Sequence, residues 1–173
     1  MMKNLFQILC GLFLVVSYSS CMHSEEDKVD VLIIGGGASG VTSGIQSARM
    51  GANTLILEES TWLGGMLTSA GVSAVDGNYR LPAGLWGEFK NRLSDYYGGL
   101  DSLKTGWVSN VLFEPSVGNK ILHEMVAAEN NLKVWKQACL EEVKRTGDEW
   151  VAKVKVEGQG VKTVRAKVMI DAT

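Results

Sequence analysis

The segment 29–59 constrains the fold more than any other part of the chain. Its residues read VDVLIIGGGASGVTSGIQSARMGANTLILEE, in which the apolar run 31–34 is followed by three glycines with the spacing G-x-G-x-x-G. A continuous run of β-forming residues is typical of a strand buried on both faces of a parallel sheet. Apolar and small residues then recur at helical spacing over 38–50, and a second strand is predicted over 54–57. This order of strand, glycine turn, helix and strand is typical of a site that holds a dinucleotide.

Each glycine of the motif has its own physical role. Gly35 permits the tight turn, Gly37 lets backbone approach a pyrophosphate, and Gly40 allows the helix to pack closely on the strand. The N-terminus of the following helix directs backbone amides and a partial positive charge at the phosphates. An ordinary α/β turn is the alternative, because glycines after a strand also serve turns that bind nothing.

Two further features follow the second predicted strand. Glu58 stands where an acid would accept hydrogen bonds from an adenosine ribose. Gly64 and Gly65 lie just beyond it, in the segment 60–71, and their lack of Cβ atoms would let backbone come close to a bulky planar or phosphorylated ligand. A flexible loop is the alternative interpretation of this segment.

In the remainder of the chain, the spacing of the apolar residues is first typical of helices and then typical of strands. Helices are predicted over 85–97 and from Pro115 onward, separated by irregular segments. Short strands are then predicted over 132–135, 138–146, 150–156, 161–166 and 168–170, and turn signals such as Gly147-Asp148 join most of them. The sequence therefore predicts an α/β fold with a parallel sheet, a helical insertion and a β-meander.

The N-terminus has the layout of a secretory signal. Lys3 precedes an apolar block over 5–16, and the small and polar residues 17–20 lead to Cys21. The block is too short to span a bilayer comfortably. We predict a signal peptide over 1–20, a short acidic tether over 21–28 and a nucleotide-binding domain over 29–173. A core helix is the alternative for the apolar block.

Charge and residue counts narrow the range of possible functions. Loss of Lys3 with the signal leaves 16 of the 17 basic residues against 19 acidic ones, a net charge of −3. The sequence has no basic stripe, so it does not predict nucleic-acid binding. Cys10 would leave with the signal, and lipidation of Cys21, which the lipoprotein resemblance described next implies, would leave Cys139 without a partner for an intramolecular disulfide. We predict no metal site, interpret His123 as a surface residue, and assign no catalytic acid or base.

Cys21 resembles the acylated cysteine of a bacterial lipoprotein, although Tyr18 stands where the lipobox usually has an aliphatic residue. The following Ser24-Glu25-Glu26-Asp27 resembles the acidic tether of surface-displayed lipoproteins of the Bacteroidetes. The resemblance implies lipidation of Cys21, a membrane anchor and a place in the cell envelope, at the outer membrane. Simple secretion with cleavage nearby is the alternative.

The motifs together resemble the FAD-dependent oxidoreductases of the glutathione-reductase superfamily, and more narrowly a secreted family common in Bacteroidetes. The resemblance covers 29–173 and implies a Rossmann-like FAD-binding domain. It is carried by the two glycine motifs, Glu58, LPAGLWGEF at 81–89, FEPSVGNKIL at 113–122 and the IDAT that ends the chain.

The resemblance also implies a role for individual residues. The FAD pyrophosphate would lie at Gly35, Gly37, Ala38, Ser39 and Gly40. Glu58 would bind the adenosine ribose, and Gly64, Gly65 and Met66 would continue toward the ribityl chain. Leu140 stands where the family offers backbone to adenine, although Cys139-Leu140 differs from the usual valine, and Ala172 and Thr173 would begin an Ala-Thr-Gly turn.

The family continues past the position of Thr173 into a substrate-binding region, so we expect this chain to be a fragment or a truncated product. The expected activity, hydride or electron transfer on an unknown small molecule, would then belong to the parent protein. One alternative is an NAD(P)-dependent dehydrogenase, whose ribose Glu58 would bind equally well. Another is a truncated surface module that binds a nucleotide without turnover.

Overall fold

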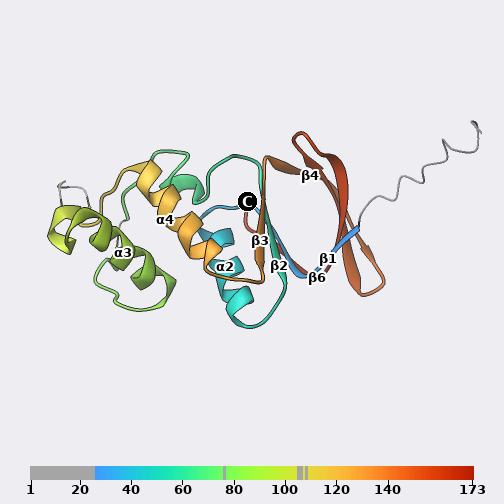
Figure 1. The fold of residues 1–173 in the computed structure, drawn as a ribbon, viewed down its shortest axis with the longest axis horizontal. Coiled ribbons are helices and arrows are strands. Elements are labelled where there is room, and N and C mark those ends of the chain that lie inside the picture. Colours follow the sequence, from blue (N-terminus) through green and yellow to red (C-terminus); the bar gives the residue numbers. More distant parts are fainter. Residues whose placement is uncertain (1–25, 76, 105–106, 108) are drawn as a thin grey trace, which may run out of the picture.

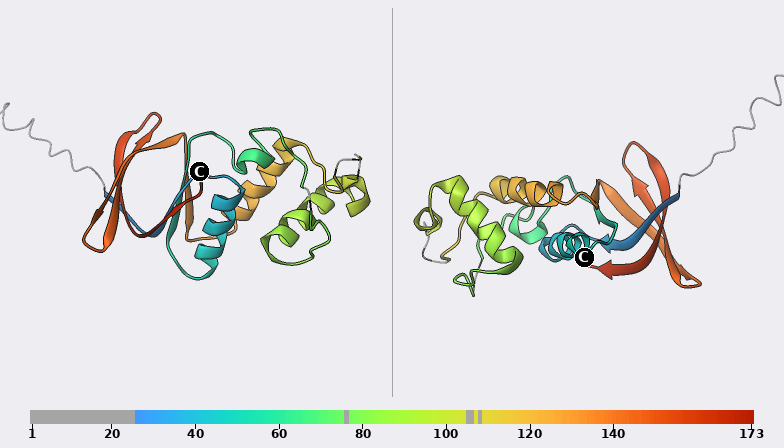
Figure 2. Two further views of the ribbon diagram at one scale, coloured as in Figure 1. Left: turned by 180° about the vertical axis from the view of Figure 1, so that it is seen from behind. Right: turned by 60° about the horizontal axis from the view of Figure 1, so that its bottom comes forward.

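A six-stranded sheet runs through the middle of the molecule, with strand order β3-β2-β1-β6-β5-β4 (Figure 1). The structure is a computed structural model that describes residues 26–75, 77–104, 107 and 109–173. The predicted signal peptide and Cys21 lie outside the described residues. Helix α3 (Gly84–Tyr97) lies at one end of the molecule and the β-meander at the other, with the parallel strands between them (Figures 1 and 2).

The parallel half of the sheet forms around β1 (Glu26–Ile34). It lies between β2 (Thr54–Glu58) and β6 (Gly160–Asp171), with which it pairs from Thr163 to Asp171, and β3 (Leu132–Lys136) pairs with the far side of β2. All three of these pairings are parallel. The predicted buried run is confirmed, since Leu32 and Ile33 are fully buried on opposite faces of β1.

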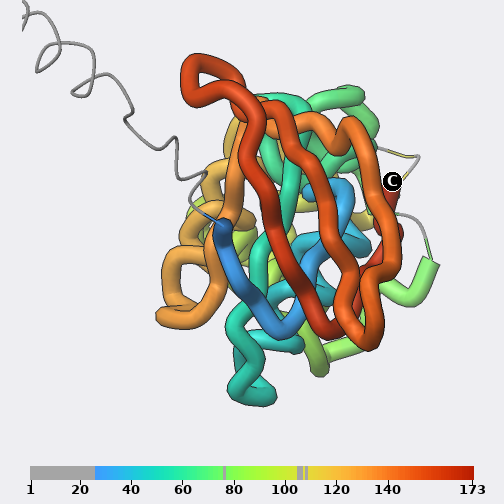
Figure 3. The backbone as a smooth tube through the Cα atoms, turned by 90° about the vertical axis from the view of Figure 1, so that its right-hand side faces the viewer, coloured from blue at the N-terminus to red at the C-terminus, as the bar shows by residue number. Residues whose placement is uncertain are grey.

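Different layers cover the two faces of the parallel half. Helix α2 (Ala38–Arg49) and helix α4 (Pro115–Ala127) pack over the face that carries Ile33, and α3 packs on α4. The opposite face, which carries Leu32, is covered by the apolar side of the meander (Figure 3). The predicted α/β fold with helical insertion and meander is therefore confirmed.

The meander consists of β4 (Ala138–Thr146), β5 (Glu149–Val156) and the N-terminal half of β6, paired antiparallel. The prediction of two strands over 161–166 and 168–170 is wrong, because β6 is continuous through both halves of the sheet. Lys167 interrupts the apolar pattern, but its side chain is exposed and its Nζ lies 2.6 Å from an Asp30 carboxylate oxygen on β1. Asp30 on the neighbouring strand neutralises the charge of Lys167, so β6 continues through this position.

Strand β1 begins within the segment 21–28 for which the sequence predicts an acidic tether. Residues 26–28 are the first of β1, and they pair with β6 from Thr163 to Arg165. Because these residues carry charged side chains, a pattern of apolar residues does not predict this part of the strand. In the fold they are matched by opposite charges, with Arg165 lying 2.5 Å from Glu26 and Lys28 lying 2.9 Å from Glu149.

Two short 3-10 helices lie within the irregular segments, η1 (Gly65–Leu67) and η2 (Leu100–Leu103). The sequence pattern predicts neither of them. Among the helices that the structure describes, none combines the length and the apolar character needed to cross a membrane.

Arg49 joins the three long helices at one end of the molecule. Its Nη1 and Nη2 donate to the two carboxylate oxygens of Glu88 on α3 at 2.6 and 2.9 Å, and its Nε donates to Glu129, just beyond α4, at 2.7 Å. The hydrogen bonds from Arg49 hold the pKa of Glu88 below its usual range. A two-pronged contact of this kind fixes the orientation of the guanidinium.

We expect Arg49→Met to lower the free energy of unfolding by about 1 kcal/mol, because the ion pairs are partly exposed and the long side chain keeps its packing. Urea unfolding followed by circular dichroism measures the change. A double-mutant cycle with Glu88→Gln is the control, since the coupling disappears in either single variant. Additive effects of the two substitutions would contradict this account.

Candidate functional site

The glycine turn after β1 is built by contacts that exclude side chains. The amide of Gly35 donates to the carbonyl of Leu57 at 2.9 Å, and a φ of +98° places Gly35 in the region that favours glycine. A Cβ on Gly35 would lie 2.7 Å from the carbonyl oxygen of Ala172. A Cβ on Gly40 would lie 1.9 Å from the carbonyl oxygen of Gly35. Helix α2 therefore packs directly on the turn that precedes it.

Gly37 differs from its two neighbours in the motif. It is the N-cap of α2 with a φ of −64°, and a Cβ there would meet nothing nearer than the Ala172 carbonyl oxygen at 3.9 Å. Packing within the described residues therefore has no need of a glycine at this position. The N-cap makes no side-chain hydrogen bond, and Ala38 and Ser39 are exposed, so the first turn of the helix is open. Open amides at a helix N-terminus attract an anion.

Glu58 braces the glycine turn from the end of β2. Its Oε2 accepts a hydrogen bond from the amide of Gly36 at 2.7 Å, and its Oε1 accepts one from the amide of Ser60 at 2.7 Å. The side chain is half-buried. Each carboxylate oxygen can accept a second hydrogen bond, so the residue can hold the turn and still bind a hydroxyl.

The double glycine lies directly against the first glycine motif. The amide of Gly64 donates to the carbonyl of Gly36 at 2.8 Å, and Gly64 forms an isolated parallel bridge with Gly37. A Cβ on Gly65 would lie 3.1 Å from the Cα of Gly37. Met66 follows with 68% of its surface exposed. Two glycine segments that are distant in sequence thus form one surface almost free of side chains.

The end of β6 completes this arrangement. The amide of Ala172 donates to the carbonyl of Ile34 at 2.8 Å, which places residues 172–173 beside Gly35. The Asp171 carboxylate accepts hydrogen bonds from the amide and the hydroxyl of Thr173 at 3.1 and 2.8 Å. We use the name turn site for the residues that the structure brings together here: Gly35, Gly37, Ala38, Ser39, Gly40, Glu58, Gly64, Gly65, Ala172 and Thr173.

Leu140 is placed differently. It lies on β4 opposite Val154, and it is packed against the core between the meander and the parallel strands. The start of β4 does approach the turn site, since the amide of Gln137 donates to the carbonyl of Ser60 at 3.1 Å and Cys139 Sγ lies 3.3 Å from Glu59 Oε1.

Sequence patterns missed the residues that hold the double glycine in place. Asn119 on α4 accepts a hydrogen bond from the amide of Leu63 at 2.9 Å through its Oδ1. The buried hydroxyl of Thr68 donates to the carbonyl of Leu63 at 2.5 Å. Gly118 on α4 leaves room for the Phe113 ring and for Thr68, because a Cβ there would lie 2.6 Å from the ring and 3.3 Å from Cγ2 of Thr68. The contact of Asn119 joins residues 56 positions apart, and no local pattern predicts it.

His123 on α4 is half-buried, although the sequence pattern indicates a surface position. Burial, together with the nearby positive charge of Lys136, lowers the pKa of His123 from its ordinary value of 6.5, and a hydrogen bond to the Thr61 backbone opposes this only in part. The imidazole is therefore neutral at pH 7.

We expect stability to fall as the pH drops below 6.5, because the unfolded chain then binds a proton that His123 in the folded chain resists. The contribution is present in full above the unfolded pKa and is lost between that value and the lower pKa of the folded state. Unfolding by urea at several values between about pH 7 and about pH 5 measures the slope. His123→Gln should flatten it, and an unchanged slope in this variant would assign the effect to another group.

Within the described residues, no group of three or more His, Cys, Asp or Glu side chains could hold a metal ion.

Comparisons with known proteins identify the family of the chain. The model of the family described as FAD dependent oxidoreductase matches residues 30–173. A search of the curated proteins gave no match. Among solved structures, a flavoprotein/dehydrogenase from Cytophaga hutchinsonii is 17% identical with a TM-score of 0.62, and 84% of this chain covers 39% of that one.

Two other solved structures show the same fold. The bacillithiol disulfide reductase from Bacillus cereus is 17% identical with a TM-score of 0.58, and 85% of this chain covers 40% of it. The anhydrotetracycline hydroxylase from Streptomyces rimosus is 13% identical with a TM-score of 0.59, and 83% of this chain covers 31% of it. The chain thus spans well under half the length of these proteins. With the family model matching nearly all of the described residues, the chain belongs to the family of FAD dependent oxidoreductases and its cofactor is FAD.

Proposed function

We propose that the turn site binds the dinucleotide half of FAD, and that the protein transfers hydride or electrons between the flavin and a small molecule. The observation that carries the proposal is Gly37. The fold has room for a Cβ at this position, yet a glycine stands there, at an open helix N-terminus against which the second glycine segment is packed. Because packing does not require this glycine, its missing side chain is best explained by a ligand that lies against the backbone.

The pyrophosphate would lie over the first turn of α2. Ala38, Ser39 and Gly40 offer backbone amides there, and the helix dipole supplies a partial positive charge. No charged side chain is needed for this part of the cofactor, since the amides and the dipole are fixed by the fold.

The remaining contacts follow from the positions of the turn-site residues. Glu58 would accept hydrogen bonds from the adenosine ribose through the lone pairs that Gly36 and Ser60 leave free. Gly64, Gly65 and Met66 would line the path toward the ribityl chain, with Ala172 and Thr173 on the opposite side of Gly35. Backbone near Leu140, on the strand that begins beside Ser60, would face the adenine.

Bound FAD supplies the hydride and electron chemistry, and the part of this chain is to bind and orient the cofactor. Glu58 holds the glycine turn in shape while it binds the ribose. Asn119 and Thr68 hold Leu63, next to the second glycine segment, and would so keep that segment in place for the cofactor. These residues act by positioning and do not exchange protons with the substrate.

The test is cofactor binding by the purified chain. We expect the protein to retain a yellow flavin, or after its removal to quench the fluorescence of added FAD at a ratio of one to one. Gly37→Ala should abolish binding and leave the fold intact, whereas Gln46→Ala, at an exposed position on the same helix, should change neither. A protein that binds NADH and never retains FAD would favour the NAD(P)-dependent dehydrogenase. A folded chain that binds neither would contradict both readings.

We also propose that residues 1–20 are a signal peptide and that Cys21 is lipidated, which anchors the protein in the outer membrane. The layout of the N-terminus supports this, with Lys3, an apolar block and an acidic segment after the cysteine. Metabolic labelling with an alkyne fatty acid, followed by membrane fractionation of cells that express the full chain, tests the proposal. Cys21→Ser should lose the label and the membrane fraction, and Cys139→Ser is the matched control. An unlabelled wild-type protein in the soluble fraction would favour simple secretion.

A further inference from the structure

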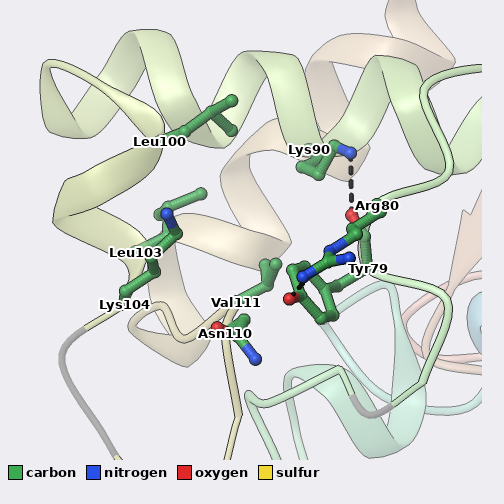
Figure 4. Close-up of a pocket in the computed structure, with 8 residues that line it drawn as sticks. All are labelled: Tyr79, Arg80, Lys90, Leu100, Leu103, Lys104, Asn110 and Val111. Carbon is green, nitrogen blue, oxygen red and sulfur yellow. Dashed lines mark hydrogen bonds between the residues drawn. The ribbon is translucent and has the colours of Figure 1, made fainter.

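A cavity of about 340 Å³ lies within the helical insertion, between α3, η2 and the segment 109–111 (Figure 4). Its volume is in the range of sites for small ligands. The cavity shares no lining residue with the turn site. Phe89 and Phe113 fill the space on the inner side of α3, with ring centroids 5.4 Å apart.

A buried cation lines this cavity. Lys90 on α3 is only 8% exposed, and its Nζ donates to the backbone carbonyls of Tyr79 and Leu81 at 2.8 and 2.9 Å. The ammonium group carries three protons, so one donor is left over. Within the described part of the chain, its polar partners are carbonyls, which carry no net charge. A buried charge is normally matched by an opposite one.

Two further cations line the same cavity. Arg80 Nε donates to the hydroxyl of Tyr79 at 3.1 Å, and its guanidinium carbon lies 5.4 Å from the centre of the Tyr79 ring. Lys104 lies on the opposite wall, where its Nζ is 2.8 Å from the exposed carboxylate of Asp101 (Figure 4). Asp101 raises the pKa of Lys104, and the positive charge of Arg80 opposes that rise, as expected of two cations that face one cavity.

The rest of the lining is apolar. Leu100, with 49% of its surface exposed, lies at the mouth beside the fully buried Leu103, and Val111 closes the inner side. An exposed leucine beside a cavity loses contact with water when an apolar ligand covers it. The lining therefore combines excess positive charge with an apolar wall.

We propose that this cavity binds a small organic carboxylate with an apolar body, such as an aryl or alkyl acid. The carboxylate accepts hydrogen bonds from Lys90 and Arg80, and the apolar body covers the exposed surface of Leu100. The ion supplies the negative charge that the buried ammonium lacks, and the leucine wall distinguishes it from inorganic anions. This site is separate from the turn site and does not depend on the flavin.

Phenylacetate is the probe, and its uncharged amide, phenylacetamide, is the matched ligand control. We expect phenylacetate to bind the full chain with a Kd of about 1 mM, a strength typical of so few atoms. Changes in ¹⁵N–¹H spectra and in tryptophan fluorescence report binding, since the Trp86 ring centre lies 5.9 Å from Lys90 Nζ. Phenylacetamide and inorganic phosphate should each bind at least about tenfold more weakly, because each lacks one half of the recognition.

Variants assign the site. Lys90→Met should weaken phenylacetate binding by at least about tenfold, and circular dichroism verifies that it folds. Because Lys90 also holds the 79–81 backbone, the exposed pair Arg80→Gln and Lys104→Gln provides an independent variant, expected to weaken binding about two- to fivefold. Lys144→Gln, on the exposed side of β4, should leave it unchanged. Equal binding of acid and amide, equal binding to all variants, or no saturable signal would overturn the proposal.

Discussion

Replacing Gly40 with alanine is expected to cost at least about 3 kcal/mol of stability and to abolish FAD binding. The added Cβ would lie 1.9 Å from the carbonyl oxygen of Gly35, and the obstacle is backbone that is itself held by a hydrogen bond to Leu57. Neither partner can rotate away as a flexible side chain would, so α2 must shift off the sheet. Urea unfolding and a flavin fluorescence titration measure the two losses.

Gly37→Ala tests FAD binding by the same motif without disturbing its packing. Its Cβ would meet its nearest neighbour at 3.9 Å, an ordinary contact, so we expect the stability of this variant to match that of the wild type within about 1 kcal/mol while FAD binding is lost. A Gly40→Ala protein that is as stable as the wild type would show that the turn is softer than its geometry indicates.

Glu58→Ala should weaken FAD binding about 10- to 100-fold and lower stability by about 2 kcal/mol. The substitution removes the acceptor for the amides of Gly36 and Ser60, which the carboxylate binds at 2.7 Å each. It would also remove the ribose acceptor, so both the shape of the turn and a direct ligand contact are lost. Flavin titration and urea unfolding on the same samples report the two effects.

Two variants make this experiment specific. Glu59→Ala is the matched control, because the neighbouring carboxylate is exposed and should leave FAD binding unchanged. Glu58→Gln keeps one oxygen acceptor and should fall between wild type and alanine in both measurements. If Glu58→Ala bound FAD with wild-type affinity, Glu58 would not contact the cofactor, and its role would be only to hold the glycine turn.

Local patterns predicted the parts of the fold that are stabilised locally. The buried run of β1, the amphipathic helices and β4 over 138–146 all appear where their periodicity places them. The glycine spacing predicted a turn that the structure forms, because a close approach of backbone to backbone requires glycine wherever it occurs. Here the residue types are dictated by their immediate neighbours in the chain.

Contacts between distant residues decided what the patterns missed. The charged start of β1 and the charged position in β6 are neutralised by residues on other strands, so polarity there does not end a strand. Asn119 supports the double glycine from a helix more than 50 residues away, and Lys90 is buried because carbonyls nine and eleven positions distant receive it. Such partners are fixed only once the tertiary structure is known.

The continuity of β6 has a consequence for the order of folding. Glu26 at the start of β1 pairs with Thr163, 137 positions later, so the central strand acquires one neighbour only after most of the chain has been synthesised. Pairings between such distant segments form slowly. Since Ala172 lies beside Gly35, the nucleotide surface is finished by the same event that closes the sheet. FAD would therefore bind only chains that have completed this closure, and by mass action would withdraw them from the pool of folding intermediates.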